Sequence, residues 1–169
     1  MNEKDLMKGV NLMSRLYEKI KTDDYEKLAT LSAAYGVSKC VHYGQVDKGG
    51  VPYFEHVNHV ADKFEDKHYK FMVVALLHDS VEDHPNRISI KCIAEVFGSQ
   101  VADAVDAITK RIGEDYFEYI ERVKENPIAR AVKIEDLKHN LDVSRLPKDL
   151  ENYTSLMKRY KDALAFLSK

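Results

Sequence analysis

Cysteines are few in this chain of 169 residues, and long apolar runs are missing. The two cysteines, Cys40 and Cys92, form no CxxC pair, so we expect reduced thiols packed in the interior rather than a disulfide framework. The longest apolar run, Phe71–Leu77, is far shorter than the roughly 20 residues that span a bilayer. The first five residues are largely polar and charged, unlike a signal peptide. These features predict a soluble cytoplasmic protein.

A strong excess of charge of either sign is also lacking. The chain has 26 Lys and Arg against 28 Asp and Glu, which gives a formal net charge of −2. Proteins that bind nucleic acid or anionic membranes usually present a strongly basic surface. We therefore expect neither partner, and a phosphate-bearing substrate would have to be attracted by local lysines or by a metal ion.

Apolar residues recur at three- and four-residue intervals along most of the chain, which is the pattern of amphipathic helices. The expected helices cover residues 6–20, 23–45, 52–64, 69–79, 89–98, 99–109, 116–124, 127–141 and 156–167. No strand pattern, repeat or low-complexity linker interrupts them. We predict an all-α protein, a bundle of about eight helices in a single domain over residues 1–169 with its core at about 25–145. The apolar stripe of the last helix is core or a dimer surface, which leaves a homo-oligomer open.

The most informative segment is an apolar helix that runs directly into a group of ionisable residues. These are His78, Asp79, Glu82, Asp83 and His84. Burying such groups costs several kcal/mol each unless they are paired or bind a metal. If the helix continues for one turn, His78 shares a face with Glu82, and Asp79 shares a face with Asp83. The adjacent His78 and Asp79 can supply an imidazole and a carboxylate to one ion, but two ligands do not complete a site.

Two other segments offer further ligands for such an ion. His56 and His59 lie three residues apart on an expected helix. Further along, Lys133, Asp136 and Asn140 fall within about 60° of one another at the helical turn of 100° per residue. A cation, a carboxylate and an amide would then lie beside the apolar face of that helix. This arrangement predicts one wall of a pocket that binds phosphate and metal.

The order of these residues resembles a known family. His56, then His78 with Asp79, then Asp136 resemble the H…HD…D ligand set of the HD phosphohydrolase superfamily. Further motifs resemble one branch, the hydrolase domain of RelA/SpoT-type alarmone enzymes and their small stand-alone relatives, and run in order from about Leu28 to Asn140. These motifs are His42-Tyr43-Gly44-Gln45, Pro52-Tyr53-x-x-His56, Ala75-Leu76-Leu77-His78-Asp79-x-Val81-Glu82-Asp83, Phe97-Gly98-x-x-Val101, Val105-x-x-Ile108-Thr109-Lys110 and Lys133-x-x-Asp136-x-x-x-Asn140.

The resemblance implies a single HD domain and a set of site residues. One manganese ion would be held by His56, His78, Asp79 and Asp136, a mixed ligand set that suits manganese or iron and leaves zinc or magnesium open. Glu82 would orient and deprotonate the attacking water, or pass a proton to the leaving group, together with Asp83. The candidates for holding phosphate or ribose are Lys48, Thr109, Lys110, Lys133 and Asn140.

The resemblance also implies a reaction. The family removes the 3′-pyrophosphate from guanosine tetra- or pentaphosphate and releases GDP or GTP with pyrophosphate. Because 169 residues leave no room for the synthetase domain of the long bifunctional enzymes, we expect a stand-alone hydrolase. Its partner would be a small nucleotide substrate.

Four positions depart from the family pattern. Asp47 and Asp142 stand where the family has arginines, Val57 replaces a proline, and His84 replaces a threonine. Arginine can stack on a base and grip phosphate with two donors, whereas aspartate does neither. The two aspartates motivate an alternative, an HD phosphatase acting on another nucleotide such as a deoxynucleoside monophosphate. A second alternative is a non-catalytic nucleotide-binding module, which would have no use for Glu82.

The chain has five further histidines outside the expected ligand set. A lone histidine on a helix is more often a surface or hydrogen-bonded residue than a ligand. We therefore expect no direct role for His59, His68 or His139. His42 is expected to orient a neighbouring loop, and His84 either ends a helix or contacts substrate.

Overall fold

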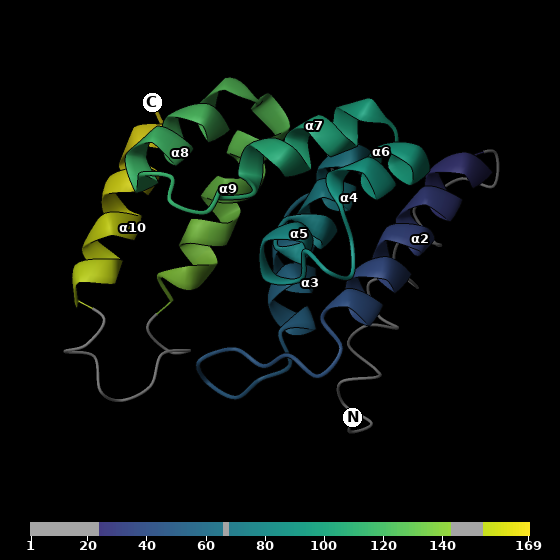
Figure 1. The fold of residues 1–169 in the computed structure, drawn as a ribbon, viewed down its shortest axis with the longest axis horizontal. Coiled ribbons are helices and arrows are strands. Elements are labelled where there is room, and N and C mark those ends of the chain that lie inside the picture. The colour runs from purple at the N-terminus through teal and green to yellow at the C-terminus, as the bar shows by residue number, and fades with distance from the viewer. Residues whose placement is uncertain (1–23, 66–67, 143–153) are drawn as a thin grey trace.

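In a computed structural model the chain is a bundle of α-helices (Figure 1). The structure describes residues 24–65, 68–142 and 154–169. The helices in these ranges are α2 (Tyr25–Val41), α3 (Phe54–Asp62), α4 (Tyr69–Leu77), α5 (Ser80–Asp83), α6 (Ile90–Phe97), α7 (Ser99–Ile108), α8 (Tyr116–Glu125), α9 (Pro127–Asn140) and α10 (Thr154–Leu167). Over the described ranges there is no strand, only one isolated bridge between Val46 and Pro52. The prediction of an all-α fold is confirmed. The helix expected over 6–20 lies outside the described residues, and the single domain with its core at about 25–145 stays a prediction. Cys40 and Cys92 are both exposed, so the expectation that they are packed in the interior is wrong.

Polar side chains at the starts of helices explain where several of them begin. Asp115 accepts the backbone N–H groups of Phe117 and Glu118, and Asn126 accepts two N–H groups in the first turn of α9. These bonds satisfy amides that have no partner inside the helix, which is worth about 1 kcal/mol per cap. Ser99 does not cap α7 as predicted, because it is the first helical residue and Gly98 precedes it with φ +84°.

Two predicted helices end earlier than expected, one at Val41 and the other at Leu77. Helix α2 stops at Val41 rather than near Gln45, because the next residues form a turn in which Gly44 has φ +82°. Glycine adopts this left-handed conformation without the steric cost that a side chain imposes. Helix α4 stops at Leu77, and the single turn α5 follows as a separate element.

Helix α4 is the centre of the hydrophobic core. Every residue from Met72 to Leu77 is buried, and α4 packs against α2, α3, α7 and α9. Fully burying an aliphatic side chain contributes roughly 1.5–3 kcal/mol, so this run fixes α4 firmly in the interior. Because the helix ends at Leu77, the chain delivers the next two residues, His78 and Asp79, to the inside of the bundle.

Helices α8, α9 and α10 lie on one side of the molecule in Figure 1, and α2 lies on the other. Helix α10 packs against α8 and α9, and its Ala163 and Leu167 belong to the buried core. Residues far along the chain from α4 thus close the bundle beside α9. Among the residues that the structure describes, no helix is long and apolar enough to cross a membrane.

Candidate active site

Four side chains with the chemistry of metal ligands meet at one buried point between α3, α4 and α9. His56 lies on α3, His78 and Asp79 follow α4, and Asp136 lies on α9. Their ligand atoms are close together, since those of His56, His78 and Asp79 all lie within 4.8 Å of one another. Oδ1 of Asp136 lies 3.1 Å from Nε2 of His56 and 3.8 Å from Nε2 of His78. The four residues predicted as ligands are therefore brought together.

The two Nε2 atoms indicate that this point suits a cation. Both are buried and make no hydrogen bond within the described part of the chain. Oδ2 of Asp79 nevertheless lies 3.1 Å from Nε2 of His78 and 3.6 Å from Nε2 of His56. Atoms that bind one ion at about 2.1 Å lie roughly 3.0–3.4 Å apart. The 3.1 Å spacings from His78 to Asp79 and from His56 to Asp136 fall in this range, and the 3.6 Å spacing from His56 to Asp79 lies just above it. The donor set fits a divalent cation.

Each histidine is held in place through its other ring nitrogen. Nδ1 of His78 lies 2.7 Å from the carbonyl oxygen of Ala75, which can only accept, so Nδ1 carries the proton. In the neutral ring, Nε2 of His78 then presents its lone pair to the other ligands. Such a partner on the far side of a ligand imidazole fixes both its tautomer and its orientation.

His56 is held by another histidine, which the sequence reasoning missed. Nδ1 of His56 lies 2.7 Å from Nδ1 of His139, and the ring of His139 stacks on that of His59 with centroids 4.0 Å apart. If Nε2 of His56 faces a cation with its lone pair, Nδ1 donates and His139 accepts. His139 follows Asp136 by three residues on α9, so it lies on nearly the same helix face. That spacing was the available signal.

Asp136 is held by residues one turn before and one turn after it on α9. Nζ of Lys133 lies 2.8 Å from Oδ2, and Nδ2 of Asn140 donates to Oδ1 at 2.6 Å. On the other side of the site, the hydroxyl of Tyr53 donates to Oδ2 of Asp79 at 2.5 Å. Lys133 and Asn140 were predicted to hold substrate, and that role stays a prediction alongside these contacts.

The buried carboxylates of Asp79 and Asp136 favour a positive charge between the four ligand side chains. Burial disfavours the charged form of His78, yet the carboxylates of Asp79 and Asp136 hold the pKa of His78 well above its usual value. Burial also disfavours the ionised form of Asp136, but Lys133 and the two imidazoles keep the pKa of Asp136 well below its usual range. The same nitrogens that bind a metal also bind protons, so the two compete.

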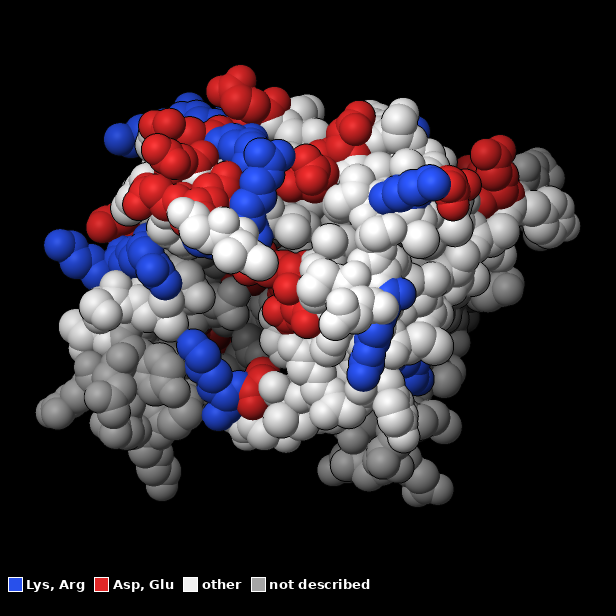
Figure 2. Space-filling model, in the orientation of Figure 1, with Lys and Arg blue, Asp and Glu red and all other residues white. Residues whose placement is uncertain are grey.

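The acidic pair on α5 lies at the same place. Glu82 and Asp83 line a cavity of about 300 Å³ together with Asp79 and Asp136. Figure 2 shows this face hollowed, with acidic and basic side chains at the hollow. Burial, with help from the charge of Asp79, raises the pKa of both Glu82 and Asp83. The described lining also includes Lys48, Lys133, Asn140 and the α10 residues Leu156, Met157 and Tyr160.

Gln45 connects Asp83 to two histidines. Its Nε2 donates to Oδ2 of Asp83 at 2.7 Å, and its Oε1 lies 2.7 Å from Nδ1 of His42 and from Nε2 of His84. Because Oε1 can only accept, both histidine nitrogens carry a proton. His42 thus contacts the neighbouring turn, as predicted for it, and His84, which stands where the family has threonine, contacts the same amide.

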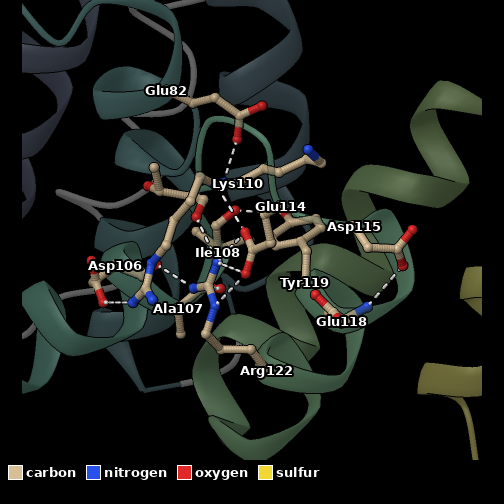
Figure 3. Close-up of polar contacts among 12 residues, drawn as sticks. Glu82, Asp106, Ala107, Ile108, Lys110, Glu114, Asp115, Glu118, Tyr119 and Arg122 are labelled. Atoms are coloured by element: carbon tan, nitrogen blue, oxygen red, sulfur yellow. Dashed lines mark hydrogen bonds and ion pairs between the residues drawn. The ribbon is translucent and has the colours of Figure 1, made fainter.

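Of the predicted pair Thr109 and Lys110, only Lys110 contacts a residue of the site, and it does so through its backbone. The hydroxyl of Thr109 donates to the carbonyl of Val105 at 2.7 Å, and the backbone N–H of Lys110 donates to Oε2 of Glu82 at 2.7 Å (Figure 3). Neither residue is among the described residues that line the cavity. Their role in holding phosphate or ribose stays a prediction, whereas the main-chain contact to Glu82 is a feature that the sequence did not indicate.

Asp47 has a structural contact in the turn that carries Lys48. Its Oδ1 accepts the backbone N–H groups of Gly49 and Val51, each at 2.9 Å. An aspartate that binds the amides that follow it stabilises a tight turn. The residue that replaces a family arginine therefore shapes the rim of the cavity, in addition to bringing a negative charge to it.

The sequence is similar to those of alarmone enzymes. It is 30% identical over 129 residues to a probable GTP pyrophosphokinase of Mycobacterium leprae, which covers 70% of this chain and 16% of that protein. It is 27% identical over 165 residues to a guanosine-3′,5′-bis(diphosphate) 3′-pyrophosphohydrolase of Borreliella burgdorferi, which covers 88% of this chain and 24% of that protein. The chain thus spans about a quarter or less of the length of these two relatives. No protein-family model matches it.

The fold is similar to that of a solved structure described as a metazoan orthologue of SpoT that hydrolyses ppGpp. The TM-score is 0.63 at 23% sequence identity, and the match covers 80% of this chain and 85% of the other. At 23% identity the structural match shows similarity of fold alone. The similarity of sequence is shown by the aligned relatives. The resemblance predicted from the motifs is confirmed: in sequence and in fold, this chain is similar to the hydrolase domain of RelA/SpoT-type alarmone proteins.

Proposed function

We propose that this protein is a manganese-dependent hydrolase that removes the 3′-pyrophosphate from guanosine 3′,5′-bis(diphosphate)-type alarmones. The observation that carries the proposal is the convergence of the unbonded Nε2 atoms of His56 and His78 on two carboxylates, beside the acidic pair. Support comes from the relative in Borreliella burgdorferi, which is named for this reaction, and from the structural neighbour, which hydrolyses ppGpp.

The cation would be held by His56, His78, Asp79 and Asp136, since these supply two imidazole nitrogens and two carboxylates at one buried point. When bound there, a divalent ion polarises a phosphoryl oxygen and lowers the pKa of water. Mixed nitrogen and oxygen ligands suit manganese. The protein contributes the fixed orientation of the ligands through Ala75, His139 and Lys133.

Glu82 and Asp83 would move the protons of the reaction. Neutral donors hold one oxygen of each, the Lys110 amide for Glu82 and the Gln45 side chain for Asp83. Burial raises the pKa of both carboxylates above their usual values, which makes each a stronger proton acceptor. One of the pair deprotonates the attacking water, and the pair together can pass that proton to the leaving oxygen.

The rest of the cavity offers what a phosphorylated nucleoside needs. Lys48 and Lys133 supply positive charge at the lining, while Leu156, Met157 and Tyr160 of α10 supply apolar and aromatic surface. Small-molecule sites commonly combine an apolar lining with a few charged groups in this way. We propose that phosphates contact the lysines and that the base lies against α10.

A nucleotide panel tests the proposed reaction. Manganese-loaded protein is incubated with guanosine tetraphosphate and with deoxynucleoside monophosphates, and the released product is identified. Pyrophosphate from the tetraphosphate is the expected result. Inorganic phosphate from monophosphates would favour the alternative phosphatase, which Asp47 at the cavity motivates. Binding without turnover of any member would favour a non-catalytic nucleotide-binding module.

We expect replacement of His139 by alanine to weaken manganese binding by roughly 10–100-fold, the usual effect of losing a partner behind a ligand imidazole. The change removes the acceptor at 2.7 Å from Nδ1 of His56, so the ring loses its fixed orientation and tautomer. Asparagine at position 139 should restore part of the affinity, because its amide oxygen can accept in a similar place. Calorimetric titration with manganese measures the effect.

The matched control for His139 is His68→Ala, which removes an exposed histidine at the start of α4. This control should bind manganese as the unchanged protein does. Equal affinity in the His139→Ala variant and the unchanged protein would show that His139 does not support the metal site.

A further inference from the structure

One guanidinium group organises the end of α7 and the loop that follows it (Figure 3). Arg122, on α8, donates from Nη1 to the carbonyl oxygens of Asp106 at 2.8 Å and Ala107 at 3.0 Å. Its Nη2 donates to the carbonyl oxygen of Thr109 at 3.0 Å. The last carbonyls of a helix have no amide partner within the helix. Arg122 therefore supplies the missing donors at this helix end.

Glu114 completes this clamp from within the loop. It accepts from Nε of Arg122 at 3.0 Å and from Nη2 at 2.8 Å, and its Oε2 also accepts the backbone N–H of Arg111 at 2.8 Å. The side chains of Arg122 and Glu114 are only 23% and 14% exposed. A two-pronged, partly buried arginine–carboxylate contact is more rigid than an exposed ion pair. The backbone is thus held at Thr109 by Arg122 and at Arg111 by Glu114.

The residue between these two anchors is Lys110, whose amide contacts Glu82. The C=O of Thr109 and the N–H of Lys110 belong to one planar trans peptide, in which they point in opposite directions. Because Arg122 binds the C=O, the N–H faces away from Arg122. There it donates to Oε2 of Glu82 at 2.7 Å.

We propose that Arg122 is a positioning residue for Glu82. With Glu114, its guanidinium fixes the Thr109–Lys110 peptide so that the Lys110 N–H holds the carboxylate in the cavity. The proposal rests on the proposed role of Glu82 in the hydrolysis. Arg122 is not among the described residues that line the cavity, so its effect passes through the peptide rather than through contact with substrate.

The contact also affects the proton affinity of Glu82. Burial raises the pKa of Glu82, and the hydrogen bond from the Lys110 amide opposes that rise because it favours the ionised form. Without the clamp the pKa of Glu82 would rise further. A base with a higher pKa is protonated over a wider range, so the acid limb of the pH–rate profile would move to higher pH.

A double-mutant cycle tests the proposal. Turnover at saturating nucleotide is measured for the unchanged protein, Arg122→Gln, Glu82→Gln and the double variant. We expect Arg122→Gln to lower kcat about tenfold, within the range for coupled network residues, while manganese affinity stays unchanged. In the Glu82→Gln background the same change should have less than about a twofold effect. Equal effects in both backgrounds would overturn the proposal.

Arg130→Gln is the matched control, because Arg130 is a half-buried arginine that donates to the carbonyl of Leu167 at the end of α10. It should show the same effect on kcat in both backgrounds. If Arg122→Gln does not fold, Arg122→Lys keeps the charge and loses the fork, and it enters the same cycle.

Amide exchange separates this proposal from the proposed function. The Lys110 amide should exchange hydrogen for deuterium faster in Arg122→Gln and at the normal rate in Arg130→Gln. If Glu82→Gln itself keeps near-normal turnover, the role of Glu82 in the reaction fails, and faster exchange at Lys110 still supports the clamp. Unchanged exchange at Lys110 in folded Arg122→Gln overturns the clamp whatever the activity.

Discussion

Replacement of Asp79 by alanine is expected to abolish manganese binding and turnover together. Asp79 offers the carboxylate oxygen that lies 3.1 Å from Nε2 of His78 and 3.6 Å from Nε2 of His56. Removing a residue that hydrogen-bonds to a metal ligand lowers metal affinity about 10–100-fold. Removing the ligand itself should lower it by more than about 100-fold. The negative charge that draws a cation to this buried point falls as well. Calorimetric titration with manganese and the nucleotide assay measure the two losses.

The loss should come from the site and not from the fold. Asp79 precedes α5 but makes no side-chain capping bond to it, so the helix loses no cap. The hydroxyl of Tyr53 loses its acceptor, which makes a melting measurement on the variant necessary. Asp103→Ala on the exposed side of α7 is the matched control and should bind manganese normally. A folded Asp79→Ala protein with normal turnover would contradict the ligand set.

The helical architecture was readable in the sequence because the apolar periodicity is strong. In α4 every residue from Met72 to Leu77 is buried, and a helix that is apolar on all sides lies in the interior of a bundle. The polar residues that follow it had to meet partners or a metal there, since burial of unpaired charges is costly. That His56 and Asp136 join His78 and Asp79 could be expected, because the four residues follow the H…HD…D order of the family. In the structure they lie at contact distance of His78.

What sequence patterns do not indicate are contacts that depend on how helices pack. His139 meets His56 because α9 lies against α3, although the two residues are 83 positions apart. Gln45 meets Asp83 and His84 across 38 and 39 positions. Each of these side chains has an ordinary surface role in most helices and turns. Only the packing of α3, α5 and α9 turns them into supports of the site.

Main-chain contacts are a second kind of feature that the sequence leaves open. Lys110 was a candidate for its side chain, yet its backbone N–H is the group that reaches Glu82. Every residue except proline has such an amide, so no residue type signals its use. Asp47 is similar in part, because its bonds to the amides of Gly49 and Val51 depend on the conformation of the turn. From the sequence alone, aspartate at position 47 indicated a negative charge but not these backbone contacts.

We expect Glu82→Gln to leave manganese bound and to slow turnover by about two orders of magnitude or more, the usual contribution of a positioned proton-transfer group. Glutamine has nearly the same shape, and its amide oxygen can still accept the Lys110 N–H. The variant loses the negative charge of the carboxylate and with it the ability to take up a proton. A drop in kcat with little change in manganese affinity would therefore identify proton transfer, rather than metal or substrate binding, as the lost step.

The matched control for this variant is Glu95→Gln, which makes the same chemical change at an exposed position of α6. It should leave kcat unchanged. Asp83→Asn should slow turnover as well if the two carboxylates share the proton, because Asp83 lines the same cavity and has its pKa raised by the same burial. Near-normal turnover in Glu82→Gln together with a large loss in Asp83→Asn would assign the base to Asp83. Near-normal turnover in both would remove the acidic pair from the reaction and leave the metal ligands as the centre of the site.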